Sequence, residues 1–99
     1  MAALISDFSL IEGRFSATEA KKVLHLLTDG KLRYHTERII TSSNAEEIQQ
    51  SKSRIQALKA LQQRINEFID AETSDGREIS MHSVIQIEVL DSSTAPIYN

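Results

Sequence analysis

The spacing of hydrophobic residues changes along the chain and divides it into four predicted elements. Residues 8–15 show no helical repeat, which predicts a strand. Alternation along this strand places Phe8 and Leu10 on one face. It places Ile11 and Phe15 on the other, so we expect both faces to be at least partly covered. Gly13 lies inside the strand and indicates a bulge or a close backbone approach.

A helix start follows the strand directly. Ser16 and Glu19 have the spacing of a capping box, in which the Ser16 hydroxyl accepts from the Glu19 N–H and the Glu19 carboxylate accepts from the Ser16 N–H. The preceding Ile-Glu-Gly-Arg, residues 11–14, resembles the cleavage sequence of a clotting protease. Because cleavage within a strand needs local opening, we interpret these residues as part of a strand-to-helix junction.

The first helix is predicted over residues 17–40. Its hydrophobic stripe shifts at Asp29-Gly30, a common turn pair, so a turn there is the alternative. One long helix, bent or slipped near Gly30, is favoured because glycine inside a helix costs only about 1 kcal/mol relative to alanine. The two stripes consist of Ala20, Val23, Leu24 and Leu27, and then of Leu32, His35 and Ile39.

A second helix is predicted over residues 45–71, after a polar connector that offers several N-caps. Its inward positions recur every seven residues, a coiled-coil-like pattern. A short connector between two long helices predicts an antiparallel helical hairpin. The heptad positions are Ile48, Ile55, Gln62 and Ile69, with Ser51, Leu58 and Ile65; Leu61 and Phe68 widen the stripe.

A second strand, residues 78–90, is predicted after the Asp75-Gly76 turn. One face carries Ile79, Met81, Ile85, Ile87 and Val89, interrupted by Ser83, and the other carries Ser80, His82, Gln86 and Glu88. The whole is an α+β fold in a single domain, residues 1–99, with 1–7 and 91–99 expected as mobile tails.

The hairpin returns the chain to its starting end, so the two strands can pair antiparallel. A two-stranded sheet is marginal in water and leaves two free edges. We therefore expect the sheet to be completed by self-association, most simply as a symmetric homodimer.

Composition narrows the function classes. Of 99 residues, 40% are hydrophobic and 25% are charged. The net charge of −3 provides no electrostatic attraction to nucleic acid or to anionic membranes. The absence of cysteine excludes disulfides and thiolate metal sites. No segment approaches the roughly 20 apolar residues of a membrane span, and the first residues lack the features of a secretory signal. A cytoplasmic protein is expected.

The pattern I-E-G-x-F-S-x-x-E-A, followed by an apolar helix and K-L-x-Y-H, resembles the opening of small uncharacterised bacterial proteins of similar length. The resemblance covers Leu10 to about Ile69. It implies a complete natural protein, and it carries no activity that could be transferred.

Among the candidate functional residues, histidines come first. A metal site needs three or more converging ligands, and the spacing of His25, His35 and His82 does not provide them. His35 is the strongest candidate because polar residues surround it. The functional candidates are therefore Tyr34, His35, Glu37 and Arg38. The alternative is that His35 only packs between the helices, which is the more common role of a histidine in this position. No metal or cofactor site is predicted.

Other chemistry has less support. Glu67, Asp70 and Glu72 could form an acid–base or cation site, but a solvated face near the end of the helix explains them much better. Basic residues on both helices are interleaved with acidic ones, which disfavours nucleic-acid binding. Glycine-rich phosphate loops and nucleophile elbows are absent from the sequence.

Three functions remain, in order of preference. The first is a noncatalytic protein-interaction or structural module that forms a homo-oligomer and contacts a protein partner. The second is a small enzyme or ligand-binding protein with an inter-subunit pocket near His35. The third is nucleic-acid binding.

Overall fold

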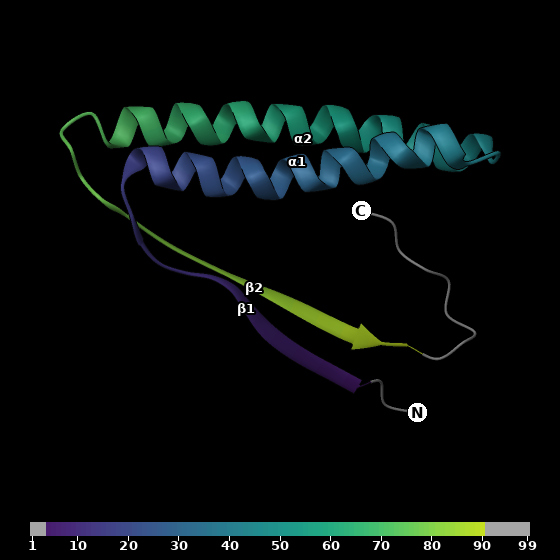
Figure 1. Ribbon diagram of the computed structural model, residues 1–99, viewed down its shortest axis with the longest axis horizontal. Coiled ribbons are helices and arrows are strands. Elements are labelled where there is room, and N and C mark those ends of the chain that lie inside the picture. The colour runs from purple at the N-terminus through teal and green to yellow at the C-terminus, as the bar shows by residue number, and fades with distance from the viewer. Residues whose placement is uncertain (1–3, 91–99) are drawn as a thin grey trace.

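The computed structural model describes residues 4–90 in the order β1, α1, α2, β2. Strand β1 spans Leu4–Phe15, helix α1 Ala17–Thr41, helix α2 Ala45–Glu72 and strand β2 Ile79–Val89. The helices form an antiparallel hairpin in one layer, and β1 and β2 form a two-stranded antiparallel sheet in a second layer (Figure 1). The predicted fold class is confirmed.

The helix bounds agree with the prediction to within a residue, but β1 is longer than expected. It begins at Leu4 instead of Phe8, because Leu4 pairs with Val89 and extends the ladder to the end of β2. Residues 4–7, expected as part of a mobile tail, therefore lie in the strand. The expected tail over 91–99 lies outside the described residues, as do residues 1–3.

The junction between β1 and α1 forms at Ser16, as predicted. Its backbone is extended, and its hydroxyl accepts a hydrogen bond of 3.2 Å from the Glu19 N–H. The Glu19 carboxylate accepts from the Ser16 hydroxyl at 3.0 Å, where the sequence predicted the Ser16 N–H as donor. Residues 11–14 belong to β1, so the protease-like letters are part of a strand-to-helix junction.

Helix α1 is continuous through Gly30. The glycine is exposed, and a Cβ built on it would meet nothing within 4 Å. The predicted alternative, a turn at Asp29-Gly30, does not form, and a single glycine inside a long helix costs only about 1 kcal/mol. At the other end of the hairpin, Asn44 caps α2 by accepting from the N–H groups of Glu46 and Glu47.

The faces of β1 differ from the prediction because of a bulge. The ladder pairs Phe8 with Ile85 and Ser9 with Val84, and then Ile11 with Ser83, which leaves Leu10 as an extra residue. A bulge of this kind changes the alternation by one position. Phe8 and Ile11 therefore share a face, whereas the sequence placed them on opposite faces.

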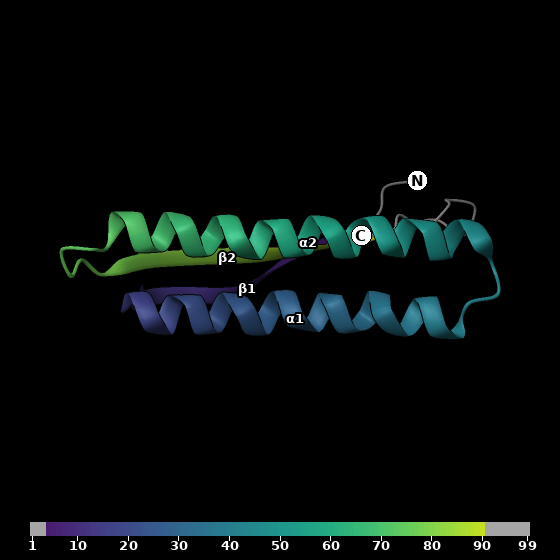
Figure 2. The same cartoon turned by 90° about the horizontal axis from the view of Figure 1, so that it is seen from above.

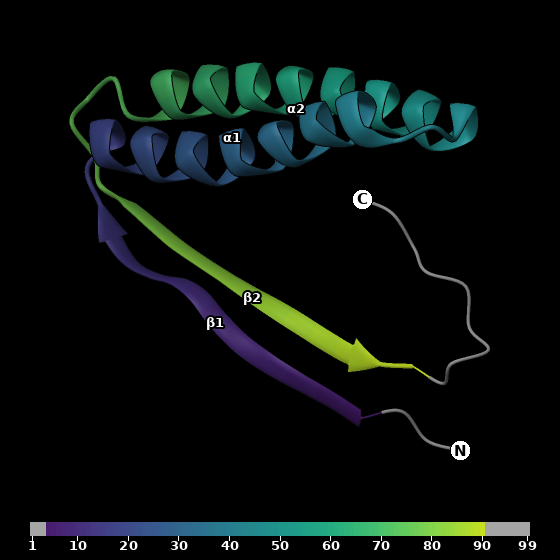
Figure 3. The ribbon, with the colours of Figure 1, turned by 45° about the vertical axis from the view of Figure 1, so that its right-hand side comes forward.

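The sheet and the hairpin meet at one end and diverge from it (Figures 1 and 3). Seen from above, β2 runs along the inner edge of α2, and β1 lies beside α1 at their junction and crosses toward α2 away from it (Figure 2). Within residues 4–90 the buried hydrophobic side chains are Ile11, Ala20, Leu58 and Ile69. Such a small core leaves a single copy of this chain with little hydrophobic stabilisation.

Candidate functional site

The sheet has one apolar and one polar face. Directly paired residues of an antiparallel ladder point to the same side, so the register assigns each residue to a face. We call the first the apolar sheet face. It consists of Leu4, Phe8, Ile11 and Phe15 from β1 and Ile79, Met81, Ile85, Ile87 and Val89 from β2. The polar sheet face carries mainly charged and hydrogen-bonding residues, among them Asp7, Ser9, Glu12, His82 and Glu88.

Coverage of the apolar sheet face depends on distance from the hairpin junction. Near the junction, Ile11 is buried, with 8% of its surface exposed, and Ile79 and Met81 are half-buried. Farther out, Phe8 is 53% exposed and Ile87 is 50% exposed. The outer half of this face is therefore an apolar surface open to water.

A groove lies where the hairpin and β2 diverge. It has a volume of about 510 Å³ and is lined mainly by Leu24, Leu61, Ile65, Phe68, Ile79 and Met81. Arg64 and Ser80 supply polar groups to its lining. Phe68 is 68% exposed, so the groove opens to solvent and continues the apolar surface of the sheet onto α2.

Polar pairs join the two helices along the hairpin. Lys21 Nζ lies 2.7 Å from Asp70 Oδ1 near the sheet junction. His25 and Asn66 are hydrogen-bonded at 3.0–3.1 Å through the imidazole Nε2. The Gln62 side-chain amide donates to Thr28 Oγ1 at 2.6 Å and to Asp29 Oδ1 at 2.8 Å; these residues lie farther along the hairpin. These pairs set the register of α1 on α2.

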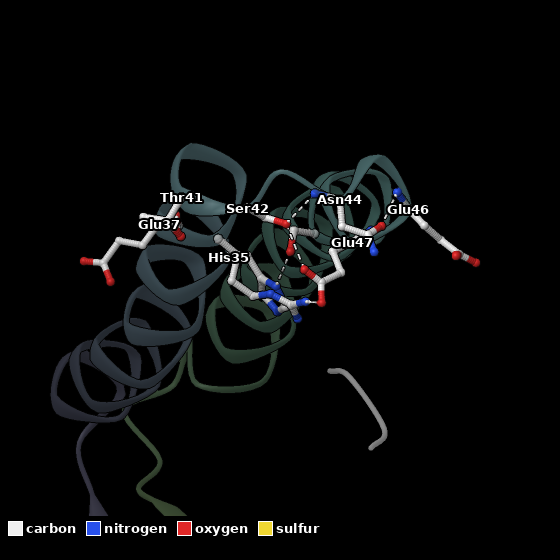
Figure 4. Close-up of polar contacts among 9 residues, drawn as sticks. His35, Glu37, Thr41, Ser42, Asn44, Glu46 and Glu47 are labelled. Carbon is white, nitrogen blue, oxygen red and sulfur yellow. Dashed lines mark hydrogen bonds and ion pairs between the residues drawn. The ribbon is translucent and has the colours of Figure 1, made fainter. Parts of the chain in front are cut away.

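The strongest candidate from the sequence, His35, is enclosed between the helices near their connector. It is 1% exposed, and its Nδ1 lies 3.2 Å from the hydroxyl of Ser51, which is also 1% exposed (Figure 4). The Tyr34 ring meets the imidazole edge to face, with centroids 5.1 Å apart. His35 is therefore surrounded by packed groups.

Arg38 lies one helical turn after His35 and forms an ion pair across the hairpin. Its Nη2 is 3.2 Å from Glu47 Oε1, and its side chain is 14% exposed. The Ser42 hydroxyl donates to the other Glu47 oxygen at 2.8 Å, so connector, α1 and α2 meet at one carboxylate. Arg38 also lies 5.9 Å from the centroid of the Tyr34 ring, a cation–π distance.

Glu37 does not belong to this group. Two residues along a helix is about 200°, so it points to the opposite side of α1 from His35 (Figure 4). The structure thus brings together Tyr34, His35 and Arg38 and leaves Glu37 in solvent. Two residues that sequence reasoning did not connect with His35, Ser51 and Glu47, complete the cluster from α2.

The remaining candidates have ordinary structural surroundings. Asp70 pairs with Lys21, and Glu67 accepts from the Gln63 amide at 3.1 Å on the same helix. His82 lies exposed on the polar sheet face, opposite Glu12. Over residues 4–90, no three metal-ligating side chains gather into a group that could hold an ion.

Comparison with protein-family models, with curated proteins and with solved structures finds no match to this chain. No helix within the described part of the chain is long and apolar enough to cross a membrane.

Proposed function

We propose that the chain is a noncatalytic interaction module that assembles with itself through its exposed apolar surface. One observation carries the proposal. Within residues 4–90, fifteen large hydrophobic side chains are exposed while four hydrophobic residues are buried. Five of the exposed ones, on the apolar sheet face, are Leu4, Phe8, Ile85, Ile87 and Val89.

The size and continuity of this surface support assembly. Five side chains exposed by 43–76% present on the order of 400 Å² of apolar surface, a patch that in soluble proteins marks an interaction site. The groove along α2 adjoins it. A two-stranded sheet without further cover is only marginally stable in water, so a second copy would stabilise the fold as well as cover the patch.

The surroundings of His35 support a structural role for it. A catalytic side chain must reach its substrate, and His35 is enclosed by Tyr34, Ser51 and the two helix backbones. The groove next to the sheet is lined by other residues, mostly aliphatic, so it suits an apolar partner better than polar chemistry.

Sedimentation equilibrium at micromolar concentration tests the proposal. We expect a mass about twice the 11.1 kDa of one chain. Phe8→Lys, which places a charge on the apolar sheet face, should weaken association at least about tenfold because the charge must be desolvated. Ser9→Lys is the matched control, since Ser9 is the next residue and its side chain lies on the polar sheet face, where the same charge stays in water. A monomer at these concentrations would overturn the proposal, and equal effects of the two substitutions would exclude the apolar sheet face as the contact.

A further inference from the structure

The two free edges of the sheet differ in their suitability for pairing. β1 contains the bulge at Leu10 and a Gly13 with φ of +153°, and both features disturb an edge. β2 runs for 11 residues, Ile79–Val89, without a bulge, proline or glycine. Glu88 is its one acidic residue, and lysine and arginine are absent from it. Natural sheets usually protect a free edge with bulges, prolines or charged residues, and β2 has few of these.

We infer that the free edge of β2 pairs antiparallel with β2 of a second copy, to form one continuous sheet in the order β1–β2–β2–β1. The inference rests on the proposed self-assembly and adds to it a backbone contact along the sheet edge, beside the apolar sheet face. In symmetric antiparallel pairing, each residue of one copy lies opposite a residue of the other. The two residue numbers add up to the same sum along the whole ladder. That sum must be even, because otherwise apolar residues of one copy would meet polar residues of the other.

The contact between His82 and Glu88 favours one register among the even ones. With Ile85 opposite the partner's Ile85, His82 lies opposite the partner's Glu88, and symmetry repeats this contact. Imidazole–carboxylate contacts across strands stabilise a sheet, and the neighbouring registers instead place Glu88 opposite a neutral hydroxyl, Ser80, or an apolar side chain, Val84. On the apolar face the same register places Met81 opposite the partner's Val89. The apolar sheet faces of the two copies then join without interruption.

This arrangement also addresses the uncovered part of the sheet. The strands run in opposite directions, so the partner's Ile79 end, where its hairpin meets its sheet, lies beside the Val89 end of the first copy. That end carries the most exposed residues of the apolar sheet face, Leu4 and Val89, at 76% and 57%. Each copy thus brings its helix–sheet junction to the open end of the other.

The register is testable because the chain has no cysteine. Directly opposed residues of antiparallel strands have Cα atoms about 4.5–5.5 Å apart, which a disulfide can bridge. Ile85→Cys should therefore form a disulfide-linked dimer rapidly under mild oxidation. Val84→Cys and Gln86→Cys, which self-pair only in displaced registers, should cross-link at least about tenfold more slowly. Ser9→Cys reports pairing through β1.

Charge substitution gives a second measurement. Glu88→Lys should weaken dimerisation about tenfold, because two His82 contacts are lost in each dimer. Asp7→Lys makes the same charge change on the polar sheet face of β1 and should have little effect. Adding His82→Glu to Glu88→Lys should recover most of the loss, because the exchange restores an acidic–basic pair between the two copies.

The outcomes separate the two proposals. A dimer in which Ile85→Cys cross-links selectively supports pairing through β2. A dimer that cross-links through Ser9→Cys, or through none of these positions, overturns the edge inference and leaves self-assembly standing. A monomer overturns both.

Discussion

His35 can be buried because its polar neighbours are supplied by the opposite helix. Ser51 is a heptad position of α2, small enough to admit the imidazole and able to hydrogen-bond with it at 3.2 Å. The adjacent Arg38–Glu47 ion pair is shielded on the arginine side and partly exposed on the glutamate side. Buried polar contacts of this kind add little net stability, and we infer that here they select the hairpin register.

Removal of the imidazole tests this structural role. His35→Ala should lower the free energy of unfolding by about 2 to 3 kcal/mol, because it leaves a cavity and deprives the Ser51 hydroxyl of a partner. Urea denaturation at fixed protein concentration measures the loss. Glu37→Ala, two residues away and exposed, should change stability by less than about 0.5 kcal/mol. Equal stabilities of the two variants would contradict the role assigned to His35.

At the scale of elements, Gly30 and Gly76 differ in backbone conformation, and only one of the two conformations needs a glycine. Gly30 sits in the exposed middle of α1, where its flexibility serves no visible purpose. Gly76 has φ of +85° in the turn after α2, and its N–H donates to the Thr73 carbonyl at 2.9 Å. The first position tolerates any helix former, whereas the second requires a left-handed conformation.

Substitution of each glycine by alanine should therefore have opposite effects. Gly30→Ala should raise the free energy of unfolding by about 0.5 to 1 kcal/mol, because alanine has the higher helix propensity and nothing obstructs its Cβ. Gly76→Ala should lower it by about 1 kcal/mol or more, since a Cβ is strained at that φ. Thermal or chemical denaturation of the pair measures both signs, and destabilisation by Gly30→Ala would indicate that α1 is not an unbroken helix in solution.

The bulge at Leu10 is the other decisive feature at this scale. Without the extra residue, β1 would place Phe8 and Ile11 on opposite faces, as the simple alternation predicts. With the bulge, Phe8, Ile11 and Phe15 share one face of the sheet. The bulge thus converts an irregular sequence pattern into a sheet with separate apolar and polar faces.

Deletion of Leu10 should restore simple alternation and destroy this separation. Either residues 4–9 or residues 11–15 would then present the wrong face to the hairpin. We expect the free energy of unfolding to fall by about 2 kcal/mol or more, as for misplacement of several core side chains. Leu10→Ser keeps the chain length and should be milder, because Leu10 is 52% exposed. Similar losses in both variants would show that the side chain, not the bulge, matters.

At the scale of the whole molecule, the arrangement of hairpin and sheet leaves apolar surface uncovered. The two layers meet at one end and diverge, so each covers only part of the other's apolar surface. A second copy is the simplest source of the missing cover.

The sequence alone determined the elements and their order, because those depend on local physics. The periods of 3.6 and 2, the capping residues Ser16 and Asn44 and the Asp75-Gly76 turn act over a few neighbouring residues. The heptad positions of α2 likewise predicted its inward face, on which Ser51, Leu58 and Ile69 are buried.

Only the tertiary structure decided which residues meet. The bulge at Leu10 follows from pairing with β2, a strand more than sixty residues away, so alternation within β1 could not reveal it. The enclosure of His35 by Ser51 and the ion pair of Arg38 with Glu47 depend on the register of two helices, which polar contacts across the hairpin set. The open apolar face depends on the angle between hairpin and sheet, and that angle is a property of packing between layers rather than of any single segment.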